Sequence, residues 1–169
     1  MTAPLNAAPL DRLIGPQLPT FRTAADIAAF EAQAPWAERV AATSTFEALQ
    51  RGAARQSDAP AIIFLPHADP DEVPVTLSHR QFIARLTQAG NAFHALGVGP
   101  GEVVSLLLPL VPQAFVALYG AQAAGIANPV NPMLSAAQLA EKLRAAGTQV
   151  LGVGGEKGDA AVWAMQLAL

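Results

Sequence analysis

Cysteine is absent from the 169-residue chain, so a disulfide, a thiolate metal site and a thiol nucleophile are all excluded. Lysine is scarce: only Lys142 and Lys157 occur, and the net charge is −3. So few cations leave no basic surface for nucleic acid. The first residues lack a basic segment followed by a continuous apolar run, so we expect no secretory leader. These absences together favour a cytoplasmic protein without a nucleic-acid partner.

Charge is missing altogether between Glu102 and Glu141. Such a stretch lies either in lipid or inside protein, because an unpaired buried charge is costly. A membrane-spanning helix needs ~20 uninterrupted apolar residues, and Pro109 and Pro112 interrupt this run. We therefore expect no transmembrane segment, but a buried strand over 103–108 and an apolar helix from Pro112 to about Ala124. A membrane-associated protein remains a further hypothesis, in which residues 103–127 would enter lipid.

Four helix starts are expected where Ser or Thr precedes an acid or amide by three residues, a spacing that lets the two residues cap the helix reciprocally. These pairs are Thr23/Asp26, Ser44/Glu47, Ser78/Gln81 and Ser135/Gln138. The third helix carries a regular apolar stripe that should face a core, formed by Phe82, Leu86, Ala89, Phe93 and Leu96. In the fourth helix the stripe is Leu139 and Leu143, and Gly147 suits the C-terminal cap.

Short β-like runs separate these helices, at 61–65, 73–76, 103–108 and 149–153. The first two are expected to form a hairpin around the Asp- and Pro-containing turn 67–72. Strands and helices alternate after that. The pattern predicts an α/β fold with helices layered around a mostly parallel sheet. Residues 1–40 are expected to form a Pro-rich arm with one short helix packed on the surface, and residues 41–169 an incomplete subdomain.

No catalytic, cofactor-binding or metal-binding residue is assigned from the sequence. The histidines are scattered and lack metal-ligand spacing, Ser105 lacks a nucleophile elbow, and the glycines of 152–158 fit no phosphate-binding fingerprint. The acidic turn 69–72 is expected to be solvated, and the large aromatic residues to be packing anchors. The residues considered are His67, His79, His94, Ser105, Asp69, Asp71, Glu72, Lys157, Trp36, Trp163 and Tyr119.

Several phrases between about Thr45 and Val153 resemble, in order and spacing, the N-terminal part of AMP-forming acyl-CoA synthetases of the adenylate-forming ligase family. The segment Asn91–Val104 is similar to the family's Gly-Val-x-x-Gly-Asp-x-Val turn, with Glu102 in place of Asp. The segment Ala123–Pro132 is similar to its Ala-Gly-x-x-x-x-Pro-x-Asn-Pro. Further similar phrases are Thr45–Leu49, Asp58–Ile63, Thr76–Phe82 and Leu108–Leu110.

The resemblance implies the N-terminal part of a large adenylating domain, and for the whole enzyme ATP, Mg²⁺ and coenzyme A. Such enzymes convert a carboxylic acid, here expected to be a fatty acid, to an acyl-adenylate and then to a thioester. The family's Ser/Thr/Gly-rich phosphate loop and its later motifs do not occur in this chain. We therefore expect a fragment that is inactive alone, binds none of these cofactors tightly, and has the remainder of the domain as its partner. The alternative is a non-catalytic binding or scaffold module with the same fold.

Overall fold

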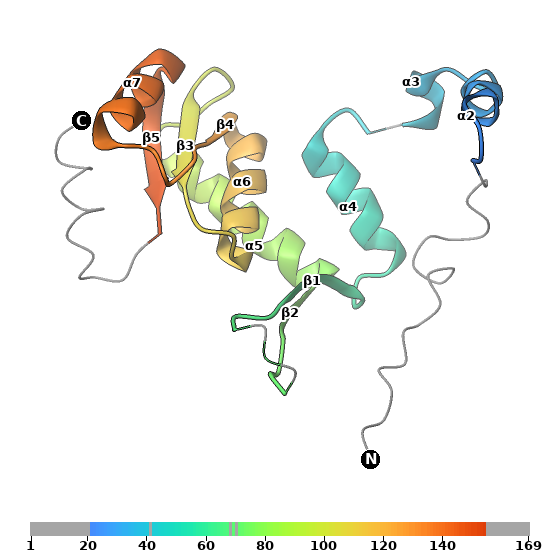
Figure 1. Ribbon diagram of the computed structural model, residues 1–169, viewed down its shortest axis with the longest axis horizontal. Coiled ribbons are helices and arrows are strands. Elements are labelled where there is room, and N and C mark those ends of the chain that lie inside the picture. The colour runs from blue at the N-terminus through green and yellow to red at the C-terminus, as the bar shows by residue number, and fades with distance from the viewer. Residues whose placement is uncertain (1–20, 41, 68, 70, 155–169) are drawn as a thin grey trace. The chain divides into compact units, whose positions relative to one another are not determined.

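The computed structural model describes residues 21–40, 42–67, 69 and 71–154 of the 169-residue chain (Figure 1). The chain divides into two compact units, Met1–Ala41 and Ala42–Leu169. Residues 155–158 of the glycine-containing segment 152–158, including Lys157, and the expected packing anchor Trp163 lie outside the described residues.

The described part of the first unit contains two helices, α2 (Ala24–Glu31) and α3 (Trp36–Arg39), whereas one short helix was expected. Thr23 caps α2 in a complete capping box with Asp26. Pro35 sets the start of α3, because its fixed backbone angle suits the residue before a helix. Trp36 is 76% exposed, so the expectation that it anchors packing is wrong for the part of this unit that the structure describes.

The second unit contains nine described elements, in which helices and strands largely alternate. They are α4 (Thr45–Arg55), β1 (Pro60–Phe64), β2 (Val75–Ser78), α5 (His79–Ala95), β3 (Val103–Leu107), α6 (Pro112–Ala124), β4 (Ile126–Pro129), α7 (Ala136–Ala146) and β5 (Thr148–Val153). No helix in the described ranges combines the length and apolarity needed to cross a membrane.

The predicted caps hold at the helix starts of this unit. Ser78 with Gln81 and Ser135 with Gln138 form complete capping boxes. At α4, the Ser44 hydroxyl accepts a hydrogen bond from the Glu47 N–H. The Glu47 carboxylate accepts from Thr43 rather than from the Ser44 N–H, with the Thr43 nitrogen and the Thr43 hydroxyl oxygen each 2.7 Å away. The box expected there is therefore only half formed, because Thr43 offers the carboxylate two donors rather than one.

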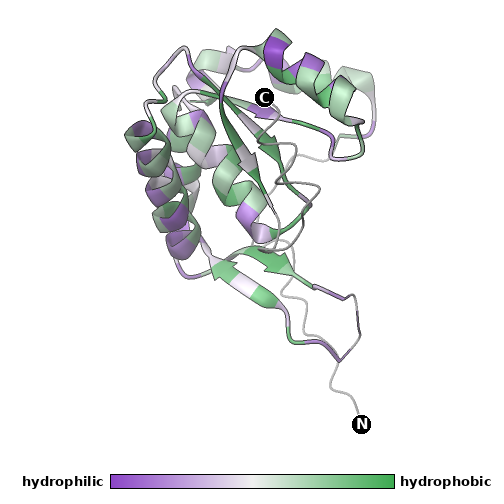
Figure 2. Ribbon diagram, turned by 90° about the vertical axis from the view of Figure 1, so that its left-hand side faces the viewer, coloured by the Kyte–Doolittle hydropathy of each residue, from purple (hydrophilic) through white to green (hydrophobic). Residues whose placement is uncertain are grey.

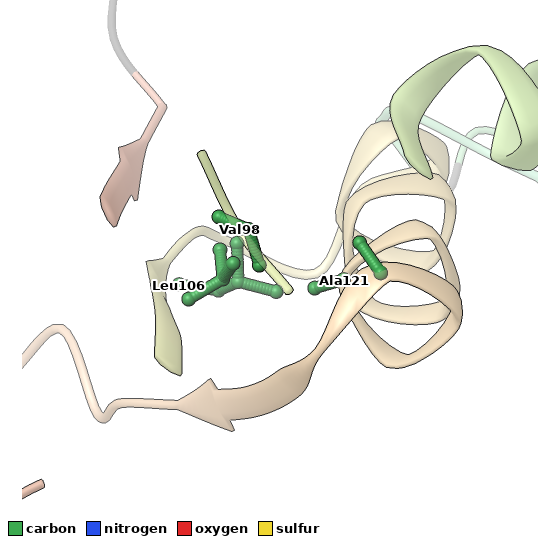
Figure 3. Packing of buried hydrophobic residues seen from close by; sticks show 5 residues of the cluster. Val98, Leu106 and Ala121 are labelled. Atoms are coloured by element: carbon green, nitrogen blue, oxygen red, sulfur yellow. The ribbon is translucent and has the colours of Figure 1, made fainter. Parts of the chain in front are cut away.

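β3 is the central strand of a three-stranded parallel sheet with the order β4-β3-β5. All five of its residues are buried, as the charge-free run predicts. Successive side chains of a strand point to opposite faces. On one face Val104 and Leu106 pack with Val98 and with Ala121 of α6 (Figure 3). On the other face Leu107 packs with Leu139 and Leu143 of α7. The expected layered α/β fold is confirmed.

α5 packs on α6 where two glycines meet. A Cβ atom on Gly120 would lie 2.6 Å from the Ala89 Cβ, and one on Gly90 would lie 3.3 Å from the Gly120 carbonyl oxygen. The helices can come this close only because both residues lack side chains. Gly90 thus occupies the inner face of α5 beside the predicted stripe. Leu96, expected in that stripe, is 61% exposed because the helix has ended at Ala95 and the chain turns at Gly97.

The predicted hairpin is confirmed: β1 and β2 pair antiparallel and form a separate two-stranded sheet. Figure 2 shows its strands mostly in hydrophobic green, away from the parallel sheet. β4 was not predicted, since Ile-Ala-Asn-Pro carries an amide and a proline. It is an edge strand of the described sheet, where a proline without an N–H is tolerated.

Candidate functional site

The carboxyl edge of the parallel sheet is the candidate functional site. After β3 the chain forms β4 along one edge of β3 and then crosses over to form β5 along its other edge. α6 and α7 cover opposite faces of this sheet. In open α/β sheets, ligands bind outside the carboxyl ends of the strands at such a reversal of strand order. The connections at this edge are residues 108–111 after β3 and 130–135 after β4, with Gly154 after β5.

These connections are tied to the strand ends by backbone hydrogen bonds. The Val130 N–H donates to the Leu106 carbonyl at 2.9 Å, and the Gly154 N–H donates to the Leu107 carbonyl at 3.3 Å. After β4, Asn131 Oδ1 accepts from the Met133 N–H at 2.9 Å and holds the turn. A Cβ atom on Gly154 would lie 3.1 Å from Pro109 Cδ, so a glycine lets the connections after β3 and β5 approach each other.

A pocket of about 360 Å³ lies at the ends of β3 and β4, against the first turns of α6. The side chains that line it are all apolar, among them Leu106, Leu108, Leu110, Phe115, Leu118 and Pro129. Leu110 is 80% exposed at its rim. The pocket can therefore take an apolar group, since it offers such a group contact area and no charged side chain.

The pocket does not suit a triphosphate. No Lys, Arg or carboxylate lines it, and α6 begins with Pro112, which has no N–H to offer an anion. Val111 provides no side-chain cap either. Phosphate oxygens need cations or aligned N–H donors, so the described residues at this edge do not fit ATP phosphates or a Mg²⁺ ion bound to them.

Ser105 lies inside β3 and is fully buried. Its Oγ is 2.7 Å from Thr148 Oγ1 of β5 and accepts from Asn128 Nδ2 of β4 at 2.9 Å. The side chain therefore joins all three strands through two hydrogen bonds. Sequence reasoning considered Ser105 only as a nucleophile. A polar residue within an otherwise apolar strand was the available sign of a buried hydrogen-bonded group.

The histidines lie apart from one another and from the pocket at the carboxyl edge. His67 Nδ1 is 3.0 Å from Glu72 Oε1 in the hairpin connection, and His94 Nδ1 is 2.8 Å from the Val98 carbonyl. His79 begins α5. In the ranges the structure describes, no group of three or more His, Asp or Glu side chains could hold a metal ion.

The acidic turn is organised around Glu72. Desolvation raises the pKa of Glu72, but the hydrogen bonds from the His67 N–H and imidazole outweigh it, so the pKa lies below its usual value. Asp69 Oδ1 accepts from the Asp71 N–H at 2.9 Å, which closes the turn locally. These contacts explain the turn without a bound cation.

The amino-acid sequence of this chain is similar to those of known proteins. A model of the "AMP-binding enzyme" family matches residues 49–166. The chain is 35% identical over 101 residues to a marinolic acid–CoA ligase of Pseudoalteromonas sp., covering 60% of the chain and 15% of that ligase. It is 28% identical over 117 residues to an acetyl-coenzyme A synthetase of Xylella fastidiosa, covering 69% of the chain and 18% of that enzyme.

A solved structure shares the fold. The N-terminal domain of FACL13 from Mycobacterium tuberculosis matches with a TM-score of 0.64 at 23% identity, over 74% of this chain and 30% of that one. The chain thus spans less than a fifth of the curated relatives described above and under a third of the solved domain. The shared fold is that of the N-terminal part of an adenylating domain. Because the family model covers most of its length, the chain belongs to the AMP-binding enzyme family.

Proposed function

We propose that this chain is the N-terminal part of an AMP-forming acid–CoA ligase. In the whole enzyme, a carboxylate oxygen attacks the α-phosphorus of Mg²⁺-bound ATP, and pyrophosphate leaves. The sulfur of coenzyme A then attacks the acyl carbon, AMP leaves and the thiol proton is released. The family match over residues 49–166 is the observation that carries this proposal.

The role proposed for the chain itself is structural. It supplies the sheet β4-β3-β5 and its covering helices as one flank of the adenylating domain, and the remainder of that domain supplies the groups that hold phosphate. The lack of any cation or carboxylate around the carboxyl-edge pocket supports this division. The chain alone is proposed to bind ATP, Mg²⁺ and coenzyme A only weakly and to be inactive.

A fatty acid is the proposed substrate, and the apolar lining of the same pocket supports an alkyl group over a charged one. We also propose a cytoplasmic location, which a chain without cysteine suits.

The experiment that tests inactivity is ATP–pyrophosphate exchange by purified residues 1–169 with acetate, hexanoate, palmitate and benzoate. We expect exchange at the level of buffer with every acid. Exchange well above buffer with any of them would show that the chain carries its own phosphate-binding groups, and would end the structural proposal.

The genomic sequence that follows codon 169 tests the family role independently. We expect an in-frame continuation encoding a Ser/Thr/Gly-rich loop that ends in lysine. A stop codon followed by an unrelated gene would instead favour the non-catalytic module.

A further inference from the structure

The parallel sheet has two outer strands, β4 and β5, with β3 between them (Figure 1). Within a strand, the backbone N–H and C=O of one residue point to one side, and those of the next residue point to the other side. The hydrogen bonds that each outer strand makes to β3 therefore show which of its residues face away from the sheet. The two outer edges prove to be different.

β4 presents a poor edge for a further strand. The Val130 N–H donates to the Leu106 carbonyl at 2.9 Å, so Val130 faces β3. Pro129 and Ala127, one and three residues earlier, face away from β3. Pro129 has no N–H to donate, and β4 is only four residues long. A short edge strand with an outward proline resists pairing with another strand.

β5 presents a complete edge. The Gly154 N–H donates to the Leu107 carbonyl at 3.3 Å, so Gly154 and, by alternation, Gly152 face β3. Leu151 and Val153 face away, each with an N–H and a carbonyl. In the part of the chain that the structure describes, β5 pairs only with β3. It is six residues long and contains neither a charged residue nor a proline, the residues that usually keep an edge strand from pairing.

Both faces of β5 are covered although its outer edge is open. Val150 packs against the hydrophobic cluster that contains Ala121 of α6. Leu151 and Val153 pack against the cluster that contains Leu139 of α7. Strands that are apolar on both faces are typical of parallel sheets between two layers of helices. The neighbour that suits this edge is therefore an apolar strand that runs parallel to β5.

We propose that the outward N–H and C=O groups of Leu151 and Val153 pair with a parallel, apolar strand from the remainder of the adenylating domain, and that Pro129 ends the sheet at β4. The proposal rests on the proposed function, which supplies that remainder. The matched part is only 30% of the solved N-terminal domain that shares the fold, so a domain of this kind has ample chain from which to add a strand. Pairing of this type adds main-chain hydrogen bonds along an existing strand edge.

Hydrogen–deuterium exchange resolved to single amides in the purified 169-residue chain tests whether the edge is open. After correction for intrinsic rates, the Leu151 and Val153 amides should exchange at least roughly tenfold faster than the Gly152 amide, because the Gly152 N–H faces β3. Equal protection of Leu151, Val153 and Gly152 would overturn the proposal, since the edge would then be covered by the chain itself or by a second copy.

The same measurement on the longer enzyme encoded by the complete reading frame tests the occupant. The Leu151 and Val153 amides should be protected there at least roughly tenfold more strongly than in the 169-residue chain. The Ala127 amide, at the outer edge of β4, is the control and should exchange alike in both proteins. Rapid exchange of Leu151 and Val153 in the longer enzyme, or protection of Ala127 instead, would overturn the proposal.

Proline variants give a second readout. Leu151→Pro removes the outward N–H of β5, whereas Leu151→Ala shortens the same side chain and keeps the N–H. In the longer enzyme, the thermal midpoint of Leu151→Pro should lie at least roughly 2 °C below that of Leu151→Ala. In the 169-residue chain the two midpoints should agree within that margin. Ala127→Pro, the same change at the outer edge of β4, should shift the midpoints of both proteins equally. Agreement of the two Leu151 variants in the longer enzyme would contradict the added strand.

These outcomes separate the proposal from the proposed function. A reading frame that ends at codon 169 would overturn both. A longer enzyme that forms an acyl-adenylate but leaves the Leu151 and Val153 amides open to exchange would overturn only the added strand. A longer enzyme in which these amides are protected but which shows no ATP–pyrophosphate exchange would overturn only the proposed function.

Discussion

Replacing Gly120 by alanine should destabilise the second unit although alanine is the better helix former. The new Cβ atom would lie 2.6 Å from the Ala89 Cβ and 3.1 Å from both the Gly90 nitrogen and the Leu86 carbonyl oxygen. None of these atoms is the end of a flexible side chain. α5 and α6 must therefore move apart, and the core around Ala121 opens with them.

The size of the effect follows from two opposing terms. Overpacking a close-packed core costs about 1–3 kcal/mol, and a contact with backbone atoms belongs at the upper end of that range. Alanine in place of glycine in a helix interior contributes about 1 kcal/mol in the other direction. We expect Gly120→Ala to lower the free energy of unfolding by about 2 kcal/mol. Gly52 of α4 is the matched control, because a Cβ atom there meets nothing within 4 Å. Gly52→Ala should stabilise by about 0.5–1 kcal/mol.

Urea unfolding followed by circular dichroism at the helix band measures both variants against the parent chain. The signs should be opposite: a lower midpoint for Gly120→Ala and a higher one for Gly52→Ala. A Gly120→Ala variant as stable as the parent would show that α5 and α6 are not in close contact at Gly90 and Gly120.

Two further perturbations probe the sheet and α4. Ser105→Ala should lower the free energy of unfolding by about 1–3 kcal/mol, because it leaves the side chains of Thr148 and Asn128 without their shared hydrogen-bond partner. An unchanged urea midpoint would contradict the hydrogen bonds that join the three strands. Backbone and hydroxyl hydrogen bonds from Thr43, and then Arg51, lower the pKa of Glu47 from 4.5 to about 2. Its stabilising contribution should be present above pH 4.5 and lost as the pH falls toward 2. Glu47→Gln should flatten that part of an acid titration of stability, and an identical acid profile would refute the assignment.

Local features of this fold were predictable from the sequence because their causes lie within a few residues. Ser78 and Gln81 are three apart and cap the same helix start, and Gly147 adopts the left-handed conformation that ends α7. β3 was predictable because its apolar run has no charged residue and is too short to cross a membrane, which leaves a buried strand as the expected structure. The long-range features were not predictable. The contact of Gly90 with Gly120 depends on how two helices cross, and neither sequence position reveals it.

The candidate site was less predictable than the fold. The side chains that line the carboxyl-edge pocket are all apolar, and no motif in the sequence predicted a pocket at this place. The pocket lies partly at the end of β4. β4 was not predicted from the sequence, because Asn128 and Pro129 are uncommon in strands. Likewise, Ser105 could not be matched to Thr148 and Asn128 without the register of the sheet, since a shift of one residue would turn each side chain to the other face.

The position of β3 between β4 and β5 also sets the order in which the nascent chain can fold. β3 leaves the ribosome before either neighbouring strand, and the forty-odd residues up to the end of β5 take roughly 2–9 seconds to synthesise at ~5–20 residues per second. During that interval α6 and β4 can close one side of β3, while the side that β5 and α7 will cover stays open to water. A strand whose five residues are all buried in the finished fold thus stays partly uncovered for this interval, and a chaperone would have an apolar segment to bind during it.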